Sequence, residues 1–353
     1  MENKYLIGGH KLYWHLDRVQ DWMNGKKIYP LYIDMSFTKN CNIGCKYCEY
    51  ATYNQTKKEF IPLDILKKFF RDCKDIGIKA IGVFGDGEPM LHPNAYEAVT
   101  NAKECGLDIG ISTNGILMKE EGLREFLEAL TFIRFNMVAG SPDTYAKTAN
   151  TSKNNFYKVK ENIKKCVDIK KKYNLPITIG IQMVLISTLK DDIINFCKIG
   201  KELGVDYAMV KQCTFNDLID KKYIISDKNV LEETFRECEG LSTDAYEVII
   251  KREQIKKQKK TYDTCYGGNF ILQMSGTGDV YVCSGFSALN RKSLGNIKEN
   301  SIKDILNSEK YNNIMKEIEK IDVHKNCLLT CRHDEINEFL WVLKHPPEHI
   351  NFI

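Results

Sequence analysis

Three cysteines within eight residues constrain this chain more than any other feature of its sequence. Cys41, Cys45 and Cys48 have the spacing C-x3-C-x2-C and come directly after the strand-like run Ile28 to Met35. Thiolates gathered this closely select zinc, copper(I) or an iron–sulfur cluster, and a cubane cluster needs four ligands, of which this loop supplies three. One iron would then keep an open position where a substrate or cofactor can bind. The next segment, 54–59, holds no further cysteine or histidine, so the spacing disfavours zinc.

The composition is that of a globular protein with one large domain and a smaller one. The chain has 353 residues, of which 43% are hydrophobic and 28% charged, and its net charge is +4. The densest basic run, Lys251 to Lys260, is interpreted as a solvated helix face, so nucleic acid is not expected as the main partner. No run reaches 18 apolar residues and the start of the chain is charged, so we expect no membrane contact and a cytoplasmic location. The odd number of cysteines, 13, points to reduced thiols and metal ligands.

Short apolar runs alternate with amphipathic segments from residue 28 onwards. The predicted strands are Leu31 to Met35, Ala80 to Phe84, Asp108 to Ser112, Phe132 to Val138, Ile177 to Ile186 and Tyr207 to Val210. The predicted helices between them are Leu63 to Ile76, Asn94 to Cys105, Leu123 to Ala129, Lys153 to Tyr173 and Asp191 to Leu203. Strands separated by helices predict a parallel sheet with right-handed crossovers. We therefore expect an α/β fold, a partial (β/α)6 barrel of TIM type, with functional residues after the carboxyl ends of the strands.

Residues able to bind a ligand do follow these predicted strands. In chain order they are the three cysteines, Gly85-Asp86-Gly87-Glu88-Pro89, Ser112-Thr113-Asn114-Gly115, Asn136, Gln182 and Lys211-Gln212-Cys213. Each group taken singly is most simply an ordinary turn or strand residue. Because the carboxyl ends of parallel strands share one edge of the sheet, their joint placement indicates a single site.

The cysteine motif, with the aromatic Tyr47 before its last cysteine, resembles that of the radical S-adenosylmethionine (SAM) enzymes. In that family three thiolates hold a [4Fe-4S] cluster, SAM chelates the fourth iron, and one electron cleaves SAM to a 5′-deoxyadenosyl radical. The resemblance implies that Cys41, Cys45 and Cys48 bind this cluster.

The same resemblance implies a set of SAM-binding residues. They are Tyr47 against the adenine, Gly85, Asp86, Gly87, Glu88 and Pro89 at the amino group, Ser112 and Asn114 after the third strand, Asn136 or Ser141 as the ribose contact, and Gln182. Asp86 stands where the family usually has a glycine, which puts the detailed geometry of this loop in question. Glycines let the backbone approach a ligand closely, and a carboxylate can orient an ammonium group.

A second group of cysteines lies near the C-terminus, at Cys265, Cys283, Cys327 and Cys331. Four cysteines can close a cluster with no open iron. Together with Gly278 and Leu294-Gly-Asn-Ile297, this group resembles the SPASM and shorter twitch extensions of radical SAM enzymes. Because the further cysteines of the full SPASM signature are absent, the resemblance implies one auxiliary [4Fe-4S] cluster in a twitch arrangement. One alternative is a structural zinc site formed by the four cysteines. His333 is expected at the surface, and its alternative role is to replace one of the cysteine ligands.

These motifs divide the chain into five predicted parts. They are a covering helix at 1–29, the radical SAM barrel at 30–213, a helical linker at 214–261, the twitch domain at 262–335 and a tail at 336–353. Within the linker we expect helix at Asn229 to Gly240 and at Ala245 to Lys260, and in the twitch domain a strand at Val280 to Val282 and a helix at Ile302 to Ile321.

Cys213 is the one cysteine outside the clusters for which we predict a catalytic role. It follows the sixth strand, where a thiol could give a hydrogen atom to a substrate radical; the alternative is a packed thiol. We expect a radical SAM oxidoreductase or epimerase that abstracts a hydrogen atom from a small polar, carbohydrate-like substrate, such as a sugar or sugar nucleotide. The product would be an epimer if Cys213 quenches the radical and a dehydrogenated compound if the auxiliary cluster accepts an electron.

The substrate prediction depends on the start of the chain. Only about 27 residues precede the predicted barrel, too few for a separate peptide-recognition domain. A flavodoxin- or ferredoxin-like protein is the expected electron donor. Two other function classes stay open: a peptide-modifying radical SAM maturase, and a non-catalytic metal-binding or nucleic-acid-binding protein.

Overall fold

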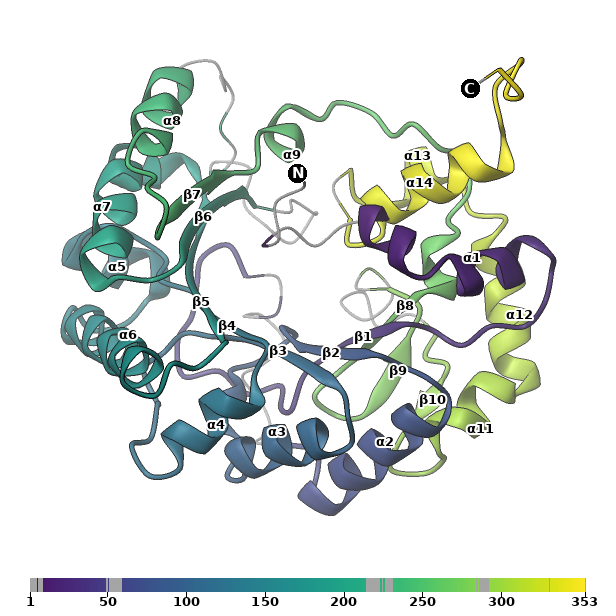
Figure 1. Cartoon of the computed structure of the whole chain (residues 1–353), viewed down its shortest axis with the longest axis horizontal. Coiled ribbons are helices and arrows are strands. Elements are labelled where there is room, and N and C mark those ends of the chain that lie inside the picture. Colours follow the sequence, from purple (N-terminus) through teal and green to yellow (C-terminus); the bar gives the residue numbers. More distant parts are fainter. Residues whose placement is uncertain are drawn as a thin grey trace.

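An arc of parallel strands with helices along its outer side forms the body of the molecule (Figure 1). The computed structural model describes residues 5, 9–48, 50, 59–213, 223, 225, 231–283, 285, 292–329 and 331–352. The strands are β1 (Tyr32–Met35), β2 (Ala80–Val83), β3 (Asp108–Thr113), β4 (Phe132–Phe135), β5 (Thr178–Leu185), β6 (Tyr207–Gln212), β7 (Glu247–Ile250), β8 (Ile271–Met274), β9 (Asp279–Tyr281) and β10 (Gly295–Asn296). Their order in the one sheet is β10-β9-β8-β1-β2-β3-β4-β5-β6-β7.

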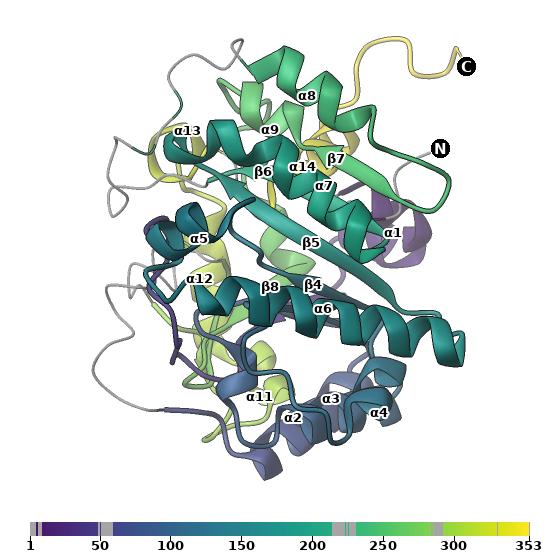
Figure 2. The same ribbon diagram turned by 90° about the vertical axis from the view of Figure 1, so that its left-hand side faces the viewer.

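Strands β1 to β7 pair in parallel, each with the next along the chain. The returning helices are α2 (Leu63–Asp75), α3 (Ala95–Glu104), α4 (Leu123–Ala129), α5 (Pro142–Ala149), α6 (Asn154–Tyr173), α7 (Ile193–Leu203) and α8 (Glu232–Glu239). Figure 2 shows α6 lying across the outer face of β4 and β5. Most of the hydrophobic core lies between this helical layer and the sheet. The predicted α/β partial barrel is confirmed, and the predicted strands coincide with β1 to β6 to within a few residues at each end.

The segment predicted as a helical linker differs from the expectation. It contains α8 but also a seventh parallel strand, β7, and the short helix α9 (Arg252–Lys256). The strand holds Val248, Ile249 and Ile250, whose branching at Cβ favours extended backbone over helix, and it pairs with the edge of β6. The prediction of helix over Ala245 to Lys260 was therefore wrong for Glu247–Ile250, which form β7.

The C-terminal part continues the same sheet. β8 pairs in parallel with β1, and β9 and β10 follow as antiparallel strands. The single helix predicted at Ile302 to Ile321 is two helices, α11 (Ile302–Asn307) and α12 (Glu309–Ile318), because the Ser308 side chain accepts a hydrogen bond from the Tyr311 N–H and so caps a new helix. Two more helices follow, α13 (Val323–Asn326) and α14 (Asp334–Lys344), and the second crosses the predicted boundary between the twitch domain and the tail.

The N-terminal covering helix packs on this C-terminal part and not on the barrel core. It comprises a 3-10 turn, η1 (Gly9–Trp14), and α1 (Leu16–Met23). Leu12 and Val19 are buried in a small core with Phe270 and with Leu340 of α14. Figure 1 shows α1 beside α14, across the molecule from α5 and α6. No helix in the described part of the chain is long and apolar enough to cross a membrane.

Aromatic side chains fill the barrel at the amino ends of its strands. Phe132 and Tyr207 begin β4 and β6, and each faces a glycine on a neighbouring strand. A Cβ atom on Gly110 would lie 2.4 Å from the Phe132 ring, and one on Gly180 would lie 2.2 Å from the Tyr207 ring. These strand glycines therefore make room for the rings, which leaves the carboxyl ends of the strands for polar residues.

Candidate active site

A cavity of about 660 Å³ opens at the carboxyl ends of the barrel strands. Most of the predicted site residues line it, namely Cys41, Cys45, Tyr47, Cys48, Gly85, Asp86, Gly87, Glu88, Ser112, Asn114, Asn136, Gln182, Cys213 and Cys331. Pro89 and Ser141 are not in this lining. Pro89 begins a 3-10 turn, η2 (Pro89–Leu91), and Ser141 caps α5 by accepting a hydrogen bond from the Thr144 N–H. Both residues therefore have structural roles, and their predicted contact with SAM stays a prediction.

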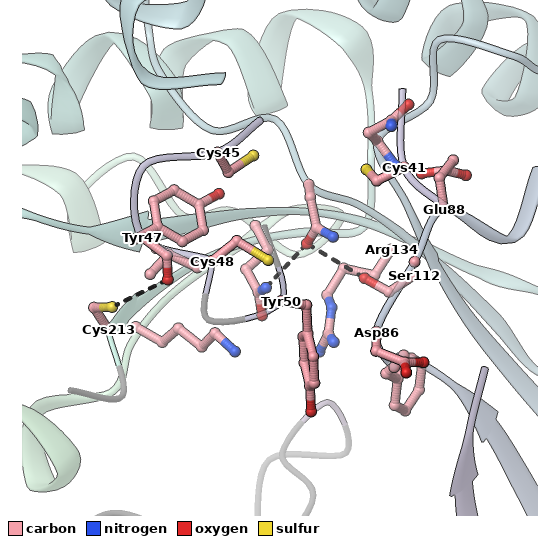
Figure 3. Close-up of a pocket in the computed structure, with 18 of the residues that line it drawn as sticks. Cys41, Cys45, Tyr47, Cys48, Tyr50, Asp86, Glu88, Ser112, Arg134 and Cys213 are labelled. Carbon is pink, nitrogen blue, oxygen red and sulfur yellow. Dashed lines mark hydrogen bonds between the residues drawn. The ribbon is translucent and has the colours of Figure 1, made fainter. Parts of the chain in front are cut away.

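The three N-terminal cysteines border one side of the cavity. Figure 3 shows the sulfur atoms of Cys41, Cys45 and Cys48 arranged around a common gap. Among the described residues no three Cys, His, Asp or Glu side chains converge closely enough to hold a single metal ion. A cubane cluster does not need such convergence, because each thiolate ligates a different iron and the sulfurs surround the cluster. The donor set therefore fits a three-thiolate cluster.

Burial keeps the thiols of this loop protonated while no metal is bound. Burial, followed by the nearby Glu88 and Cys48, raises the pKa of the Cys41 thiol to about 11. Burial and the two neighbouring thiols also raise the pKa of Cys45 far above its usual value. Thiols in this state release their protons when a positively charged metal centre arrives.

Helix α5, which the sequence analysis missed, holds the cysteine loop in place. The Gly44 N–H donates to the Ala149 carbonyl at 2.9 Å, and the Lys46 N–H donates to the Thr148 carbonyl at 3.0 Å. These acceptors are carbonyls of the last turn of α5, which lack partners within the helix. The loop is therefore anchored by backbone hydrogen bonds on both sides of Cys45.

Glu88 joins the loop after β2 to the loop after β3. Its carboxylate is buried and accepts hydrogen bonds from the Met90 N–H at 3.1 Å, the Thr113 hydroxyl at 2.6 Å and the Asn114 N–H at 2.7 Å. Burial raises the pKa of Glu88 to about 6, although these three hydrogen bonds oppose the shift. Glu88 therefore acts as a positioning residue for both loops.

The two glycines of the same loop allow its backbone to lie directly on the loop after β1. A Cβ atom on Gly87 would lie 2.2 Å from the Thr38 carbonyl oxygen, and one on Gly85 would lie 1.7 Å from the Ser36 hydroxyl oxygen. Any side chain at either position would have to displace this neighbouring loop.

Asp86, which stands where the family has a glycine, connects this loop to the C-terminal part. Its carboxylate is buried and accepts a hydrogen bond from the Gly276 N–H, in the turn after β8, at 3.1 Å. The Asp86 N–H donates to the Ser36 hydroxyl at 2.6 Å. Burial raises the pKa of the Asp86 carboxyl. The aspartate therefore serves as a tie between the barrel and the turn after β8.

Three polar side chains from adjacent strands form a hydrogen-bond network inside the cavity. The Asn136 side-chain oxygen accepts from the Ser112 hydroxyl at 3.3 Å and from the Gln182 amide at 3.0 Å (Figure 3). The Gln182 side-chain oxygen is buried and has no partner among the described residues. The network therefore retains a hydrogen-bond acceptor for a ligand.

Cys213 and Tyr47 lie together at the other side of the cysteine loop. The Cys213 thiol, which is 3% exposed, contacts the Tyr47 carbonyl oxygen at 3.8 Å (Figure 3). The Tyr47 hydroxyl interacts with Cys45, and burial raises the pKa of Tyr47. Cys213 therefore adjoins the predicted cluster loop while it also lines the cavity.

The structure adds a group of cations that the sequence analysis did not identify as a site. We call it the cationic cluster and define it as Arg134, Lys211, Lys251 and Arg332, all of which line the cavity. A period-two reading of β4 could have found Arg134, because it stands between the buried Ile133 and Phe135 and must face the barrel interior. Arg332 comes from the C-terminal part, and no local pattern predicts that it enters the barrel.

Cys265, Cys327 and Cys331 of the C-terminal group lie near one another. Cys265 accepts a hydrogen bond from the Asn337 amide at 3.5 Å, and the Cys331 sulfur lies 3.8 Å from the Tyr262 hydroxyl. Burial and the nearby Cys331 and Cys327 raise the pKa of Cys265 to about 11. Cys283 follows β9. This donor set also fits a metal cluster, and Cys331 brings it to the edge of the cavity.

His333 is buried and not at the surface as predicted. Its side chain is 2% exposed, and its Nδ1 atom lies 3.9 Å from the Cys265 sulfur. Burial, and then Arg332 and Lys260, lower the pKa of His333 to about 4. The imidazole is therefore neutral at physiological pH.

Two regions of this chain match known protein families. The sequence model of the radical SAM superfamily matches residues 35–199, and that of an iron–sulfur cluster-binding domain, SPASM, matches residues 265–332. The chain is 24% identical over 301 residues to a Pyrococcus furiosus protein described as a tungsten-containing aldehyde ferredoxin oxidoreductase cofactor-modifying protein, covering 79% of this chain and 82% of the relative. A probable GTP 3′,8-cyclase of Methanococcus maripaludis is 27% identical over 136 residues, which are 38% of this chain and 45% of that protein.

Solved structures share the fold at low sequence identity. The crystal structure of Streptococcus suis SuiB bound to S-adenosylmethionine superposes with a TM-score of 0.67 and 16% identity, covering 87% of this chain and 72% of SuiB. At this identity the likeness establishes the architecture of the chain.

Proposed function

This chain belongs to the radical SAM superfamily and carries a SPASM-type extension, with SAM and two [4Fe-4S] clusters as its cofactors, and from this premise we propose its reaction. The enzyme takes a hydrogen atom from a C–H bond of a small polar, carbohydrate-like substrate and forms an epimer or a dehydrogenated product. When bound, SAM and the reduced first cluster supply the ability to abstract a hydrogen atom from an unactivated C–H bond.

One observation carries the proposal. The same cavity is lined by the Cys41 to Cys48 loop, by Cys213 and by Cys331 of the second cysteine group. A substrate in this cavity would lie beside the loop that would hold the first cluster and also beside two groups able to decide the fate of a substrate radical. The lining further offers amide, hydroxyl and cationic side chains, which suit a polar substrate.

The protein's own residues would perform three tasks. Cys41, Cys45 and Cys48 would hold the first cluster, and the backbone after β2, kept in place by Glu88, would position SAM beside it. Ser112, Asn136 and Gln182 would orient polar groups of the ligands through their shared network. The remaining lining would exclude water from a reactive intermediate.

The two products differ in whether the substrate radical gains a hydrogen atom or loses an electron and a proton. In epimerisation, the Cys213 S–H bond breaks and a C–H bond forms on the opposite face of the substrate carbon. The sulfur radical left on Cys213 would then take one electron from the proposed flavodoxin- or ferredoxin-like donor and one proton from solvent to restore the thiol. In dehydrogenation, the substrate radical would lose one proton and one electron, and Cys265, Cys283, Cys327 and Cys331 would hold a cluster able to act as the electron acceptor.

The choice of a small polar substrate rests on the cavity and not on the relatives. The names of the relatives reported above refer to cofactor modification and to GTP, and another SuiB structure is described as bound to the precursor peptide SuiA. A peptide-modifying activity is therefore the second candidate, favoured by the fold shared with SuiB. The proposal also includes a flavodoxin- or ferredoxin-like electron donor and a cytoplasmic location, since two oxygen-sensitive clusters need a reducing compartment.

The proposal can be tested with reconstituted protein under anaerobic conditions. SAM, a chemical reductant and panels of sugars, sugar nucleotides and short peptides would be incubated in deuterated water, with 5′-deoxyadenosine and deuterium in the recovered compounds as readouts. We expect a sugar-type compound to raise 5′-deoxyadenosine formation and to gain deuterium or lose two hydrogens. Stimulation by peptides alone would contradict the proposal.

A further inference from the structure

The cationic cluster brings four positive charges from four parts of the chain into one cavity. Arg134 comes from β4, Lys211 from β6, Lys251 from the residue after β7 and Arg332 from the residues before α14. Buried or half-buried cations normally have an anionic partner, because moving a charge out of water is costly unless it is paired. The local partners of each cation therefore indicate whether a ligand is missing.

Arg332 and Lys251 have partners within the protein. Arg332 forms an ion pair with Asp34 of β1 at 3.1 Å and donates to the Tyr32 hydroxyl at 2.9 Å. Lys251 lies 4.0 Å from Glu335, whose side chain is 43% exposed at the rim. Asp34 is thus the one carboxylate inside the cavity that pairs with the cationic cluster among the described residues.

Arg134 and Lys211 have no such partner in the described part of the chain. The Arg134 guanidinium lies over the Phe84 ring at 5.0 Å, and its buried Nε atom makes no hydrogen bond. Burial, and then repulsion by Arg134, Lys251 and Arg332, lower the pKa of Lys211 to about 7. The cations therefore repel one another, and a bound anion would relieve this repulsion.

We propose that Arg134 and Lys211, supported by Lys251 and Arg332, bind a phosphate or diphosphate group of the substrate. This inference rests on the proposed function for the identity of the cavity as the substrate site. With Lys211 protonated, the four cations and their two paired carboxylates, Asp34 and Glu335, leave two positive charges without an ion-pair partner among the described residues. A phosphate or diphosphate matches these two charges, whereas a single carboxylate leaves one charge uncompensated. Guanidinium groups also bind phosphate oxygens in pairs.

We expect the anion at Arg134 to be distinct from the carboxylate of SAM. In Figure 3 the Arg134 side chain lies beside Tyr50, farther from the sulfur atoms of Cys41 and Cys45 than from that of Cys48. SAM would occupy the region of the three thiols, since it must reach the open iron. The cationic cluster would then hold the far end of the substrate and turn its sugar part toward SAM.

The test measures binding to the reconstituted, SAM-loaded enzyme by anaerobic calorimetry. The probes are UDP-glucose, glucose 6-phosphate, glucuronate and glucose, which carry a diphosphate, a phosphate, a carboxylate and no charge. We expect both phosphorylated probes to bind at least about tenfold more tightly than glucuronate and glucose, because a phosphate or diphosphate compensates two positive charges, a carboxylate one and glucose none. Equal binding of glucuronate and the phosphorylated probes would overturn the inference.

Variants of Arg134 separate the substrate anion from SAM. Arg134→Gln should weaken UDP-glucose binding about tenfold or more, Arg134→Lys should restore part of it, and Arg124→Gln on the outer surface should have no effect. SAM affinity and iron content should stay unchanged in all three. Loss of SAM binding in Arg134→Gln would mean that the cation serves the SAM carboxylate and would overturn the inference. If tight UDP-glucose binding depends on Arg134 but no hydrogen is abstracted from any probe, the anion site stands and the proposed reaction fails.

Discussion

The sulfur atom of Cys213 lies 3.8 Å from the backbone carbonyl oxygen of Tyr47, so the end of β6 touches the loop that carries the first three cysteines. This contact places a buried thiol at the boundary between the predicted cluster loop and the cavity. A hydrogen donor for a substrate radical would have to be in such a position. Cys166, by comparison, is fully buried within α6 in the core between helices and sheet.

Replacement of Cys213 tests its proposed role as hydrogen donor. Cys213→Ala should abolish incorporation of deuterium from deuterated water into the product while 5′-deoxyadenosine formation continues, because the S–H bond that returns the hydrogen is lost. Cys166→Ala is the matched control, and it should lower stability without changing the product. An unchanged deuterium content in Cys213→Ala would remove this residue from the mechanism.

Glu88→Gln should misplace the loops after β2 and β3. The glutamine side chain has one acceptor oxygen where the carboxylate has two, and its NH2 group would face a donor, either the Asn114 N–H or the Thr113 hydroxyl. We expect a loss of about 2 kcal/mol in the free energy of unfolding and weaker SAM binding. Anaerobic denaturant titration and SAM calorimetry would measure both. A variant with wild-type stability and SAM affinity would show that this hydrogen-bond set does not position the loop.

Asp86→Ala should loosen the C-terminal turn from the barrel. The substitution removes the acceptor of the Gly276 N–H, which is buried. We expect a cost of about 1 to 3 kcal/mol, together with faster amide hydrogen exchange at Gly276. Hydrogen exchange followed by mass spectrometry reads out this segment. Equal protection of Gly276 in both proteins would contradict the proposed tie.

Binding of a diphosphate should depend on pH through Lys211. With no anion present, the lowered pKa of about 7 means that the side chain loses its charge as pH rises through neutrality. A bound diphosphate would raise this pKa again, so binding takes up a proton above about pH 7, and affinity for UDP-glucose should fall by up to about tenfold per pH unit there. The charge of this probe is constant over the range. The Lys211→Arg variant should bind UDP-glucose equally tightly below and above about pH 7. A pH dependence that persists in this variant would assign the proton to another group.

The sequence predicted the architecture well because local periodicity reports local structure. Strands β1 to β6 and their helices follow apolar runs whose period is set by the backbone, and the loop motifs fall at strand ends by topology. Strand β7 was missed because its run of three branched residues lies in a charged, helix-like context. Helix α5 was missed for a different reason, because it is short and follows directly on the strand region.

The site was predicted in part, and what was missed depends on distant contacts. The sequence indicated the seven cysteines as ligands and Asp86 as a departure from the family motif, but not that Asp86 would meet Gly276, which is 190 positions away. The cationic cluster likewise joins residues from four distant segments, and burial of His333 results from packing against Gly267 and Cys265. Pairings of this kind are set by tertiary structure and leave no local pattern.

The most direct test of the account is the iron and sulfide content of anaerobically reconstituted protein, measured with 5′-deoxyadenosine formation. Wild type would be compared with the Cys265→Ala/Cys283→Ala double variant and with Cys41→Ala. We predict about eight irons in wild type and about four in each variant, with SAM cleavage retained in the double variant and lost in Cys41→Ala. About four irons in both wild type and the double variant, or cleavage that survives in Cys41→Ala, would contradict the two-cluster account.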